Sequence, residues 1–307
     1  MVIKAFKRLS PLRIKQLKEL ETVCKEADST LCDVFCEPEL NSTHALPAFF
    51  YAFSGRELLG CLTLFLPGDG SAEISALVHP KARQSGVFSS LFAEARKTIT
   101  SLGCNKVLLV CVPGIPATYG VLKKLNAKHA STEYKMSLTN SVTEPSGATG
   151  KKEASDQKSV LENSGAGSAN TTEKMPVLKP ATRNDLPEIA KMDALFFDSD
   201  YFSSLDWLDA LFPLENTNIF KLVLGRKIIG TGAFVLENNS VSLFGIGLLP
   251  EYRGKGYGRF LVERLLAEAP AGKPVVLQVS DLNAIALSLY KKLGFTVAAE
   301  QQFWSVK

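Results

Sequence analysis

The chain has 307 residues, of which 46% are hydrophobic and 21% are charged, with a formal net charge of +4 at pH 7. This length favours two domains, and the composition is that of an ordinary globular protein. No apolar run approaches the roughly eighteen residues that suggest a membrane-spanning helix. The charged N-terminal stretch also lacks the apolar core of a secretory signal. We therefore expect a cytoplasmic protein with no membrane partner.

The distribution of charge and cysteine argues against nucleic-acid and metal binding. Lysine and arginine outnumber aspartate and glutamate by 17 to 12 before residue 141, and the two groups are equal, at 14 each, after residue 176. This excess is thinner than the basic patch of a nucleic-acid-binding protein, so no nucleic acid is expected. The cysteines include no C-x-x-C pair, which favours small buried thiols over a metal site or disulfides. All six lie in the first half: Cys24, Cys32, Cys36, Cys61, Cys104 and Cys111.

Residues 141–176 form the clearest boundary in the chain. They contain no aromatic residue and are rich in Ser, Gly, Thr, Glu and Lys. Such a segment buries too little apolar surface to offset the entropy lost on ordering. We therefore predict a flexible linker at 141–176 between two independently folded domains, residues 1–140 and residues 177–307.

A strand, a glycine-rich loop and a helix are predicted in succession over residues 243–266. An apolar run ends at Leu249, Pro250 marks a turn, and an amphipathic pattern begins at Tyr257. Between them lies Arg253-Gly254-Lys255-Gly256-Tyr257-Gly258. The unpaired N–H groups and positive dipole end of the helix, together with two cationic side chains, predict a pyrophosphate site. The glycine spacing fits neither the dinucleotide fingerprint nor the P-loop.

The pattern R-x-x-G-x-G, from Arg253 to Gly258, resembles the acyl-CoA-binding motif of the GNAT superfamily of N-acetyltransferases. A second stretch, residues 277–295 (LQVSDLNAIALSLYKKLGF), resembles the second signature of that family. In it Asn283 stands at a predicted helix start, and Tyr290 follows seven residues later. The resemblance covers residues 177–307 and implies an α/β domain whose mixed, mostly antiparallel sheet is flanked by helices.

The first half matches these signatures in part, which implies two tandem GNAT folds. Arg83 corresponds to Arg253 and Gly86 to Gly256 at an offset of 170 residues. Other positions differ: Phe88 replaces Gly258, Ile115 replaces Asn283, and Leu122 replaces Tyr290. We therefore expect a degenerate first domain that supports the active second one, and a second CoA site is the alternative.

The resemblance implies acetyl-CoA as co-substrate, no metal, and transfer of an acetyl or other acyl group to a primary amine. The strand end at Leu248-Leu249 would offer free backbone N–H groups to the pantetheine and the thioester oxygen. Asn283 would hold the pantetheine arm, and Tyr290 would be the general acid toward the leaving thiolate. The expected cofactor-binding residues are Leu248, Leu249, Arg253, Gly254, Lys255, Gly256, Tyr257, Gly258 and Asn283.

The general base and the acceptor stay open at this stage. Ser242 stands where some relatives place a glutamate, which leaves four acidic side chains as candidate bases: Asp198, Asp200, Glu237 and Asp281. The aromatic residues of 196–212 fit either the core or an acceptor pocket. The acceptor is a small molecule or a peptide, and a homodimer is one option for assembly. The alternative function is an acyl-CoA-binding regulatory protein without efficient catalysis.

Overall fold

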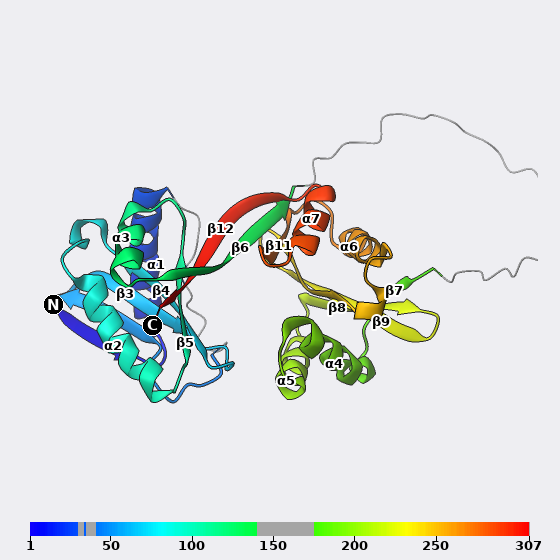
Figure 1. Ribbon diagram of the computed structural model, residues 1–307, viewed down its shortest axis with the longest axis horizontal. Helices are drawn as coiled ribbons and strands as arrows, with labels where there is room; N and C mark the ends of the chain where they lie inside the picture. The colour runs from blue at the N-terminus through cyan, green and yellow to red at the C-terminus, as the bar shows by residue number, and fades with distance from the viewer. Residues whose placement is uncertain (30–33, 35–40, 140–174, 307) are drawn as a thin grey trace, which may run out of the picture. The chain divides into compact units, whose positions relative to one another are not determined.

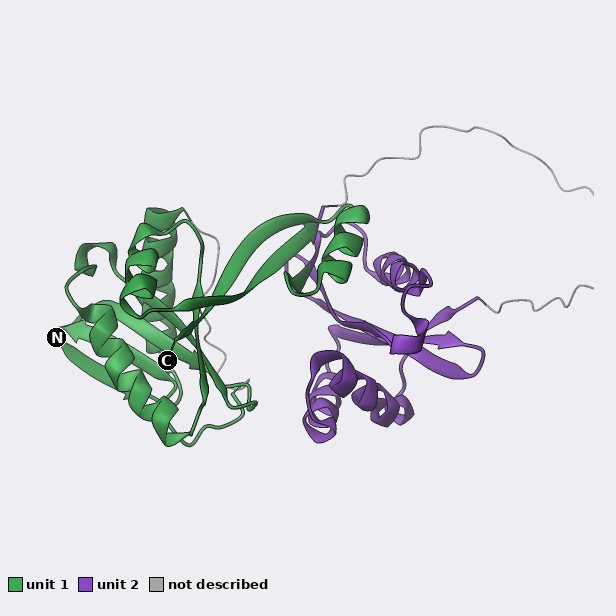
Figure 2. Ribbon diagram, in the orientation of Figure 1, with its two compact units in different colours: residues 1–137, 277–307 green, residues 138–276 purple. Residues whose placement is uncertain are grey.

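The computed structural model describes residues 1–29, 34, 41–139 and 175–306. They form two compact units, coloured separately in Figure 2: unit 1 comprises residues 1–137 and 277–307, and unit 2 comprises residues 138–276. All but the last two residues of the predicted linker, 141–176, lie outside the described residues. Within the described part, no helix is long and apolar enough to cross a membrane.

Unit 1 is a mixed sheet covered by helices (Figure 1). Strands β1 to β4 pair as successive antiparallel neighbours, and β4 pairs with β5 in parallel. Helix α1 packs against β3 and β4, and α2 packs against β2 and β3. Its elements are β1 (Val2–Phe6), α1 (Pro11–Asp28), β2 (Phe49–Ser54), β3 (Glu57–Phe65), β4 (Ser71–Val78), α2 (Val87–Ser101), β5 (Lys106–Cys111), α3 (Pro116–Lys124), β6 (Lys128–Leu138), β11 (Val275–Ser280, which begins in unit 2), α7 (Ala284–Lys292) and β12 (Thr296–Val306).

The last strand of the chain completes the sheet of the first half. β12 pairs antiparallel with β5, where Val306 lies opposite Val107, and on its other side with β6, where Thr296 lies opposite Ser137. This division differs from the expected domains 1–140 and 177–307, because residues 277–307 pack with the first half. The physical reason is the outer edge of β5, which would otherwise expose unpaired N–H and C=O groups. β12 pairs these groups and adds Val306 to the unit 1 core.

Unit 2 contains four successive antiparallel strands, β7 to β10, with helices on both sides. Gly225 stands in the turn between β8 and β9, where it adopts φ +66°. Helix α5 begins at Tyr201 because the Asp200 carboxylate accepts hydrogen bonds from the N–H groups of Phe202 and Ser203. The elements are β7 (Val177–Pro180), α4 (Leu186–Phe197), α5 (Tyr201–Leu211), β8 (Thr217–Leu224), β9 (Lys227–Leu236), β10 (Val241–Leu248) and α6 (Tyr257–Glu268).

Two glycines show how closely the helices approach this sheet. A Cβ on Gly232 would collide with Leu265 of α6, and a Cβ on Gly247 would collide with Phe196 of α4. Gly247 lies opposite Thr231, the neighbour of Gly232, so the two glycines face opposite sides of the sheet. Helix α6 therefore covers one face, and α4 with α5 covers the other (Figure 1). The α/β class and the mixed, mostly antiparallel pairing agree with the prediction.

Candidate functional site

The junction between β10 and α6 leaves the N-terminus of a helix uncovered. Gly254 and Gly256 adopt φ of +74° and +83°, and a Cβ at either position would meet no atom within 4 Å. Gly256 is the N-cap of α6 and supplies no side chain to cap the first helical N–H groups. These donors and the helix dipole therefore face the open space over the glycines. A phosphate group could approach the backbone there without steric hindrance.

Arg253 is held at one end of its guanidinium and accessible at the other. Its Nε donates a hydrogen bond to the carbonyl oxygen of Leu248 at 3.0 Å. The guanidinium carbon lies 6.0 Å from the centroid of the Phe196 ring, which fixes its plane further. No carboxylate among the described residues forms an ion pair with Arg253. Its positive charge therefore remains available for an anionic ligand.

A β-bulge precedes the loop. The pairing of β10 with β9 shifts between Phe244 and Gly247, and Gly245 adopts φ +60°. The buried Thr231 hydroxyl donates to the Gly245 carbonyl oxygen at 3.1 Å and fixes the bulge. A bulge redirects backbone groups away from the ladder. The sequence analysis did not identify Thr231, because a single threonine in a strand carries no distinguishing signal.

The expectation of free amides at the end of β10 is wrong for Leu249. The Leu249 N–H donates to the Ile229 carbonyl oxygen at 2.9 Å and is not free for a ligand. Backbone groups alternate in direction along an antiparallel strand, so the Leu248 N–H points away from β9. The physical reason for the correction is that the ladder with β9 continues one residue beyond the strand.

The aromatic residues of α4 and α5 divide between core and surface. Phe196 packs against Gly247, and the Trp207 ring contacts Phe244 edge-to-face at 5.6 Å. Phe202 is 72% exposed and Phe197 is 54% exposed. Apolar rings therefore line the bulge, and further rings remain on the adjacent surface.

Helix α4 carries a carboxylate, that of Asp193, which was not selected from the sequence. Asp193 of α4 is half-buried, and burial raises the pKa of its carboxyl group above the usual value. The Ser204 hydroxyl donates to it at 2.8 Å. Asp193 lies on the apolar stripe of α4, three residues before Phe196. A charged residue on such a stripe was the sequence signal that could have identified it.

The four candidate bases named from the sequence have different surroundings. Hydrogen bonds from Ser203 and Phe202 hold the pKa of Asp200 below its usual range, which makes it a weak base. Glu237 accepts hydrogen bonds from the hydroxyl groups of Ser240 and Ser242, each at 2.6 Å. The two others lie elsewhere: Asp198 is the exposed C-cap of α4, and Asp281, in unit 1, accepts a hydrogen bond from the Thr132 N–H.

Asn283 and Tyr290 belong to unit 1, whereas the loop from Arg253 to Gly258 belongs to unit 2. Asn283 is the N-cap of α7, as predicted, and its Oδ1 accepts from the Ala286 N–H at 3.1 Å. Tyr290 is 7% exposed and packs edge-to-face on Phe295 at 5.8 Å. Burial raises the pKa of Tyr290 to about 12, so its hydroxyl keeps its proton at neutral pH. This value lies further from the ordinary thiol pKa of about 8.5 than does the usual tyrosine pKa of about 10.

No group of three or more His, Cys, Asp or Glu side chains in the described part of the chain could hold a metal ion. The site consists instead of a bulged strand, an arginine anchored on that strand, and an uncapped helix N-terminus. These features form an α/β strand–loop–helix junction of the kind to which a phosphate group could bind.

Residues 184–295 match the family model described as the acetyltransferase (GNAT) family. This segment is therefore similar to the GNAT acetyltransferase family. A [ribosomal protein bS18]-alanine N-acetyltransferase of Haemophilus influenzae is 32% identical over 77 residues, which are 24% of this chain and 52% of that protein. An uncharacterised protein of Mycobacterium leprae is 28% identical over 127 residues, which are 39% of this chain and 34% of that protein. The chain thus spans about a third and about half of the lengths of these two relatives.

Solved structures share the fold at low sequence identity. A GCN5-related N-acetyltransferase from Sphaerobacter thermophilus aligns with a TM-score of 0.76 at 14% identity, over 99% of this chain and 94% of that one. A tandem GNAT protein from the clavulanic acid biosynthesis pathway aligns with a TM-score of 0.63 at 15% identity, over 99% of this chain and 98% of that one. These similarities support the α/β fold predicted from the sequence.

Proposed function

We propose that this protein is an N-acyltransferase that moves an acetyl or other acyl group from a CoA thioester to a primary amine. The observation that carries the proposal is the β10–α6 junction of unit 2. There, two glycines with positive φ leave the helix N-terminus uncovered, and Arg253 presents its guanidinium without a carboxylate partner. A CoA pyrophosphate has the charge and the size that this arrangement suits.

The proposed roles follow from the local contacts. Gly254, Lys255, Gly256, Tyr257 and Gly258 would surround the pyrophosphate with backbone N–H groups and one ammonium group. The amide of Leu248, which points away from β9, would bond the pantetheine or the thioester oxygen. An oxygen held by a backbone N–H is stabilised as negative charge develops on it during acyl transfer.

The transfer itself requires two proton movements. The amine nitrogen attacks the thioester carbonyl carbon, the C–N bond forms, the C–S bond breaks, and the sulfur leaves as a thiolate. A base takes the proton of the amine, and Tyr290 would give a proton to the thiolate. Asn283, at the start of the same helix, would hold the pantetheine arm. Asp193, with its raised pKa, joins Glu237 as a candidate base in unit 2.

The experiment is a pair of measurements on the full chain. Calorimetric titration of acetyl-CoA measures binding, and a thiol reagent that detects free CoA measures transfer to a panel of amines, amino acids and peptides. We expect saturable binding and amine-dependent release of thiol. Binding without thiol release for any amine would favour the regulatory alternative. Absence of binding by acetyl-CoA and by longer acyl-CoAs would refute the proposal.

A further inference from the structure

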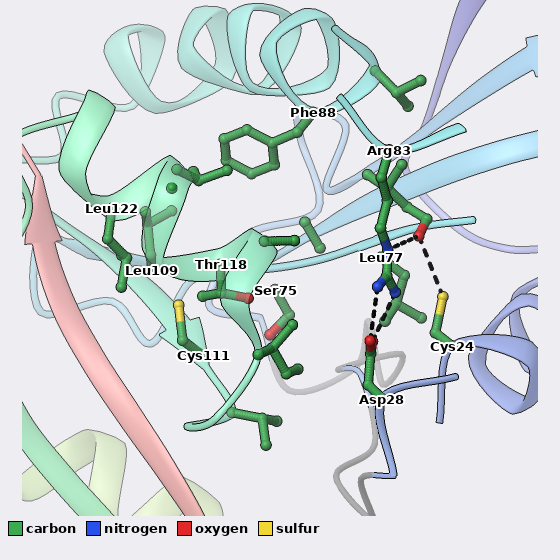
Figure 3. Close-up of a pocket in the computed structure, with 18 of the residues that line it drawn as sticks. Cys24, Asp28, Ser75, Leu77, Arg83, Phe88, Leu109, Cys111, Thr118 and Leu122 are labelled. Atoms are coloured by element: carbon green, nitrogen blue, oxygen red, sulfur yellow. Dashed lines mark hydrogen bonds and ion pairs between the residues drawn. The ribbon is translucent and has the colours of Figure 1, made fainter. Parts of the chain in front are cut away.

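Unit 1 contains a cavity of about 740 Å³ that the proposed function does not use (Figure 3). It lies where β4 and β5 part: their parallel pairing covers Ser71–Ile74 and ends opposite Leu109. Beyond this point Ser75 and Leu77 of β4 line the cavity, together with Cys111 of β5. Residues from the start of α2 and from α3 complete the wall. The volume falls in the range of small-molecule pockets, which is about 300–1,000 Å³.

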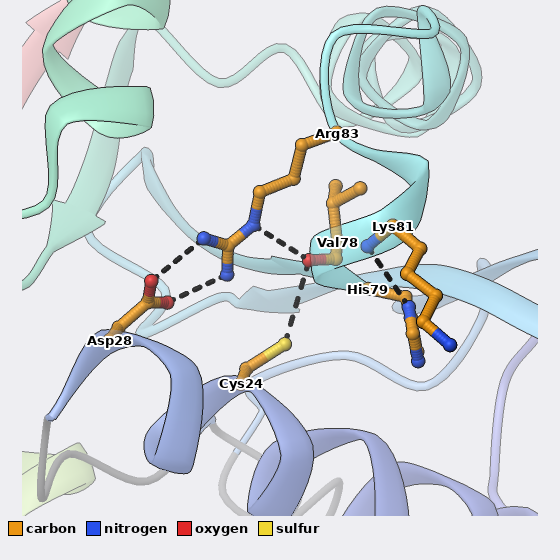
Figure 4. A network of polar contacts seen from close by, with 6 residues as sticks. All are labelled: Cys24, Asp28, Val78, His79, Lys81 and Arg83. Carbon is orange, nitrogen blue, oxygen red and sulfur yellow. Dashed lines mark hydrogen bonds and ion pairs between the residues drawn. The ribbon is translucent and has the colours of Figure 1, made fainter.

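The guanidinium of Arg83, at the rim of this cavity, is paired with a carboxylate (Figure 4). Both terminal nitrogens of Arg83 donate to the carboxylate of Asp28, each at 2.7 Å. The Arg83 Nε donates to the Val78 carbonyl oxygen at 3.2 Å, an oxygen that also accepts from the Cys24 thiol at 3.5 Å. All three donor nitrogens of the guanidinium therefore have protein acceptors. An anionic ligand would have to compete with the Asp28 carboxylate for this positive charge.

Arg83 and Arg253 occupy equivalent positions in the two units but differ in their partners. Each arginine donates its Nε to the carbonyl of the residue five positions earlier, and each is followed after three residues by an N-cap glycine with φ near +80°. The backbone thus repeats almost unchanged in the two halves. Only Arg83 has a carboxylate partner, since no described carboxylate forms an ion pair with Arg253. The loop of unit 1 has kept its shape and lost its net positive charge.

The interior of the cavity is apolar and includes an aromatic ring. Phe88, in the first turn of α2, replaces the glycine of the other half and stacks on Phe92 at 5.7 Å. Phe88 and Leu122 both line the cavity (Figure 3). Burial raises the pKa of Cys111 to about 12, so this thiol is neutral and behaves as a small apolar group. The β3–β4 ladder is also unbroken, without the bulge that β10 carries.

We propose that this cavity binds an uncharged, mainly apolar small molecule, and not a second CoA thioester. The apolar walls and the Phe88 ring favour such a ligand. The Arg83 guanidinium, which corresponds to Arg253, is neutralised by Asp28 and offers a pyrophosphate no free charge. Of the two lysines that line the cavity, Lys25 forms an ion pair with Glu21 at 3.9 Å, which leaves Lys124. This inference does not depend on the activity proposed for unit 2.

The test uses N-phenyl-1-naphthylamine, an uncharged probe whose fluorescence rises in an apolar site, with the full chain. Gly120 of α3 lines the cavity, and a Cβ there would meet no atom within 4 Å. Gly120→Phe places a bulky ring at the cavity wall, and the helix gains a better former than glycine. We expect saturable binding to the natural chain and an affinity weaker by about tenfold or more in Gly120→Phe. The matched control, Gly120→Ala, should stay within about twofold of the natural chain.

Two results would overturn the proposal. One is equal probe affinity in Gly120→Phe and Gly120→Ala, which would mean that the probe binds elsewhere. The other is displacement of the probe by acetyl-CoA with the same potency in the natural chain and in Gly256→Val, since the loop of unit 2 is obstructed in that variant. The second result would identify the cavity as a CoA site.

Discussion

The ring of Phe196 packs against Gly247 so closely that a methyl group on Gly247 would overlap three of its ring carbons. The same ring lies 6.0 Å from the guanidinium carbon of Arg253. One side chain of α4 thus contacts the strand that carries the bulge and lies beside Arg253. The glycine is needed at position 247 because of the close approach and not because of its backbone angle, since its φ is not positive.

Gly247→Ala should therefore destabilise the protein. The added methyl forces the Phe196 ring or β10 to move, at a cost of about 1–3 kcal/mol in the free energy of unfolding. Denaturant titration measures this cost. In a Phe196→Ala background the same substitution should cost at least about 0.5 kcal/mol less, because the colliding ring is gone. Equal costs in both backgrounds would show that the contact is not the cause.

Gly256→Val should abolish acetyl-CoA binding in a folded protein, because its side chain would fill the space expected for the pyrophosphate. The matched control is Gly225→Val in the β8–β9 hairpin. Both glycines have positive φ, +83° and +66°, and open space around a Cβ. Each valine therefore carries a similar backbone strain of about 1–2 kcal/mol. Calorimetry should detect lost binding only at position 256, and retained affinity there would refute the loop assignment.

Local features of this fold were predictable from the sequence, because they depend on residues close together in the chain. The strand–loop–helix junction, the Gly225 turn and the Asn283 cap each follow from a few neighbouring side chains. Long-range pairing was not predictable in this way. Val306 lies opposite Val107, about two hundred residues away, and the apolar pattern of β12 does not specify which strand edge it joins.

The residues of the candidate site divide in the same way between local sequence patterns and long-range contacts. The glycines and Arg253 were recognisable by their spacing, whereas Thr231 and Asp193 act through contacts with other elements. The Arg83–Asp28 pair is a further example, since its partners lie 55 residues apart. In the sequence Arg83 looks like Arg253, and only the tertiary contact reveals that its charge is neutralised.

Tyr290→Phe should lower turnover by about a hundredfold and leave the Kd of acetyl-CoA nearly unchanged. The substitution removes a hydroxyl that has no hydrogen-bond partner among the described residues, so thermal unfolding should change little. Because the pKa of Tyr290 is raised to about 12, the loss of turnover that its ionisation causes in the natural protein should begin above pH 10. Unchanged turnover at saturating concentrations of both substrates would remove Tyr290 from the acid role.

Glu73 of β4 should make stability depend on pH. Burial, and then the charges of Glu133 and Asp69, raise its pKa to about 7. In the unfolded chain the Glu73 carboxyl group releases its proton near pH 4.5, whereas in the folded chain it holds the proton up to about pH 7. The stability present below pH 4.5 is therefore lost as the pH rises through 7. Glu73→Gln should therefore match the natural chain at pH 4 and exceed it at pH 8 by about 1–3 kcal/mol. The exposed Glu57→Gln is the control, and a Glu73→Gln variant with an unchanged pH slope would contradict this account.

The pairing of β12 with β5 predicts that a mutation at the end of the chain weakens the first half. Val306 is 7% exposed within the unit 1 core, whereas Val297 of the same strand is 45% exposed. Val306→Ala should lower the free energy of unfolding by about 1–3 kcal/mol, and Val297→Ala by much less. Amide hydrogen exchange should accelerate at Lys106–Cys111 in the first variant, because these residues lose a packed neighbour. If exchange along β5 were the same in both variants, β12 would not stabilise that edge. Such a result would favour residues 177–307 as a separate domain, as predicted from the sequence.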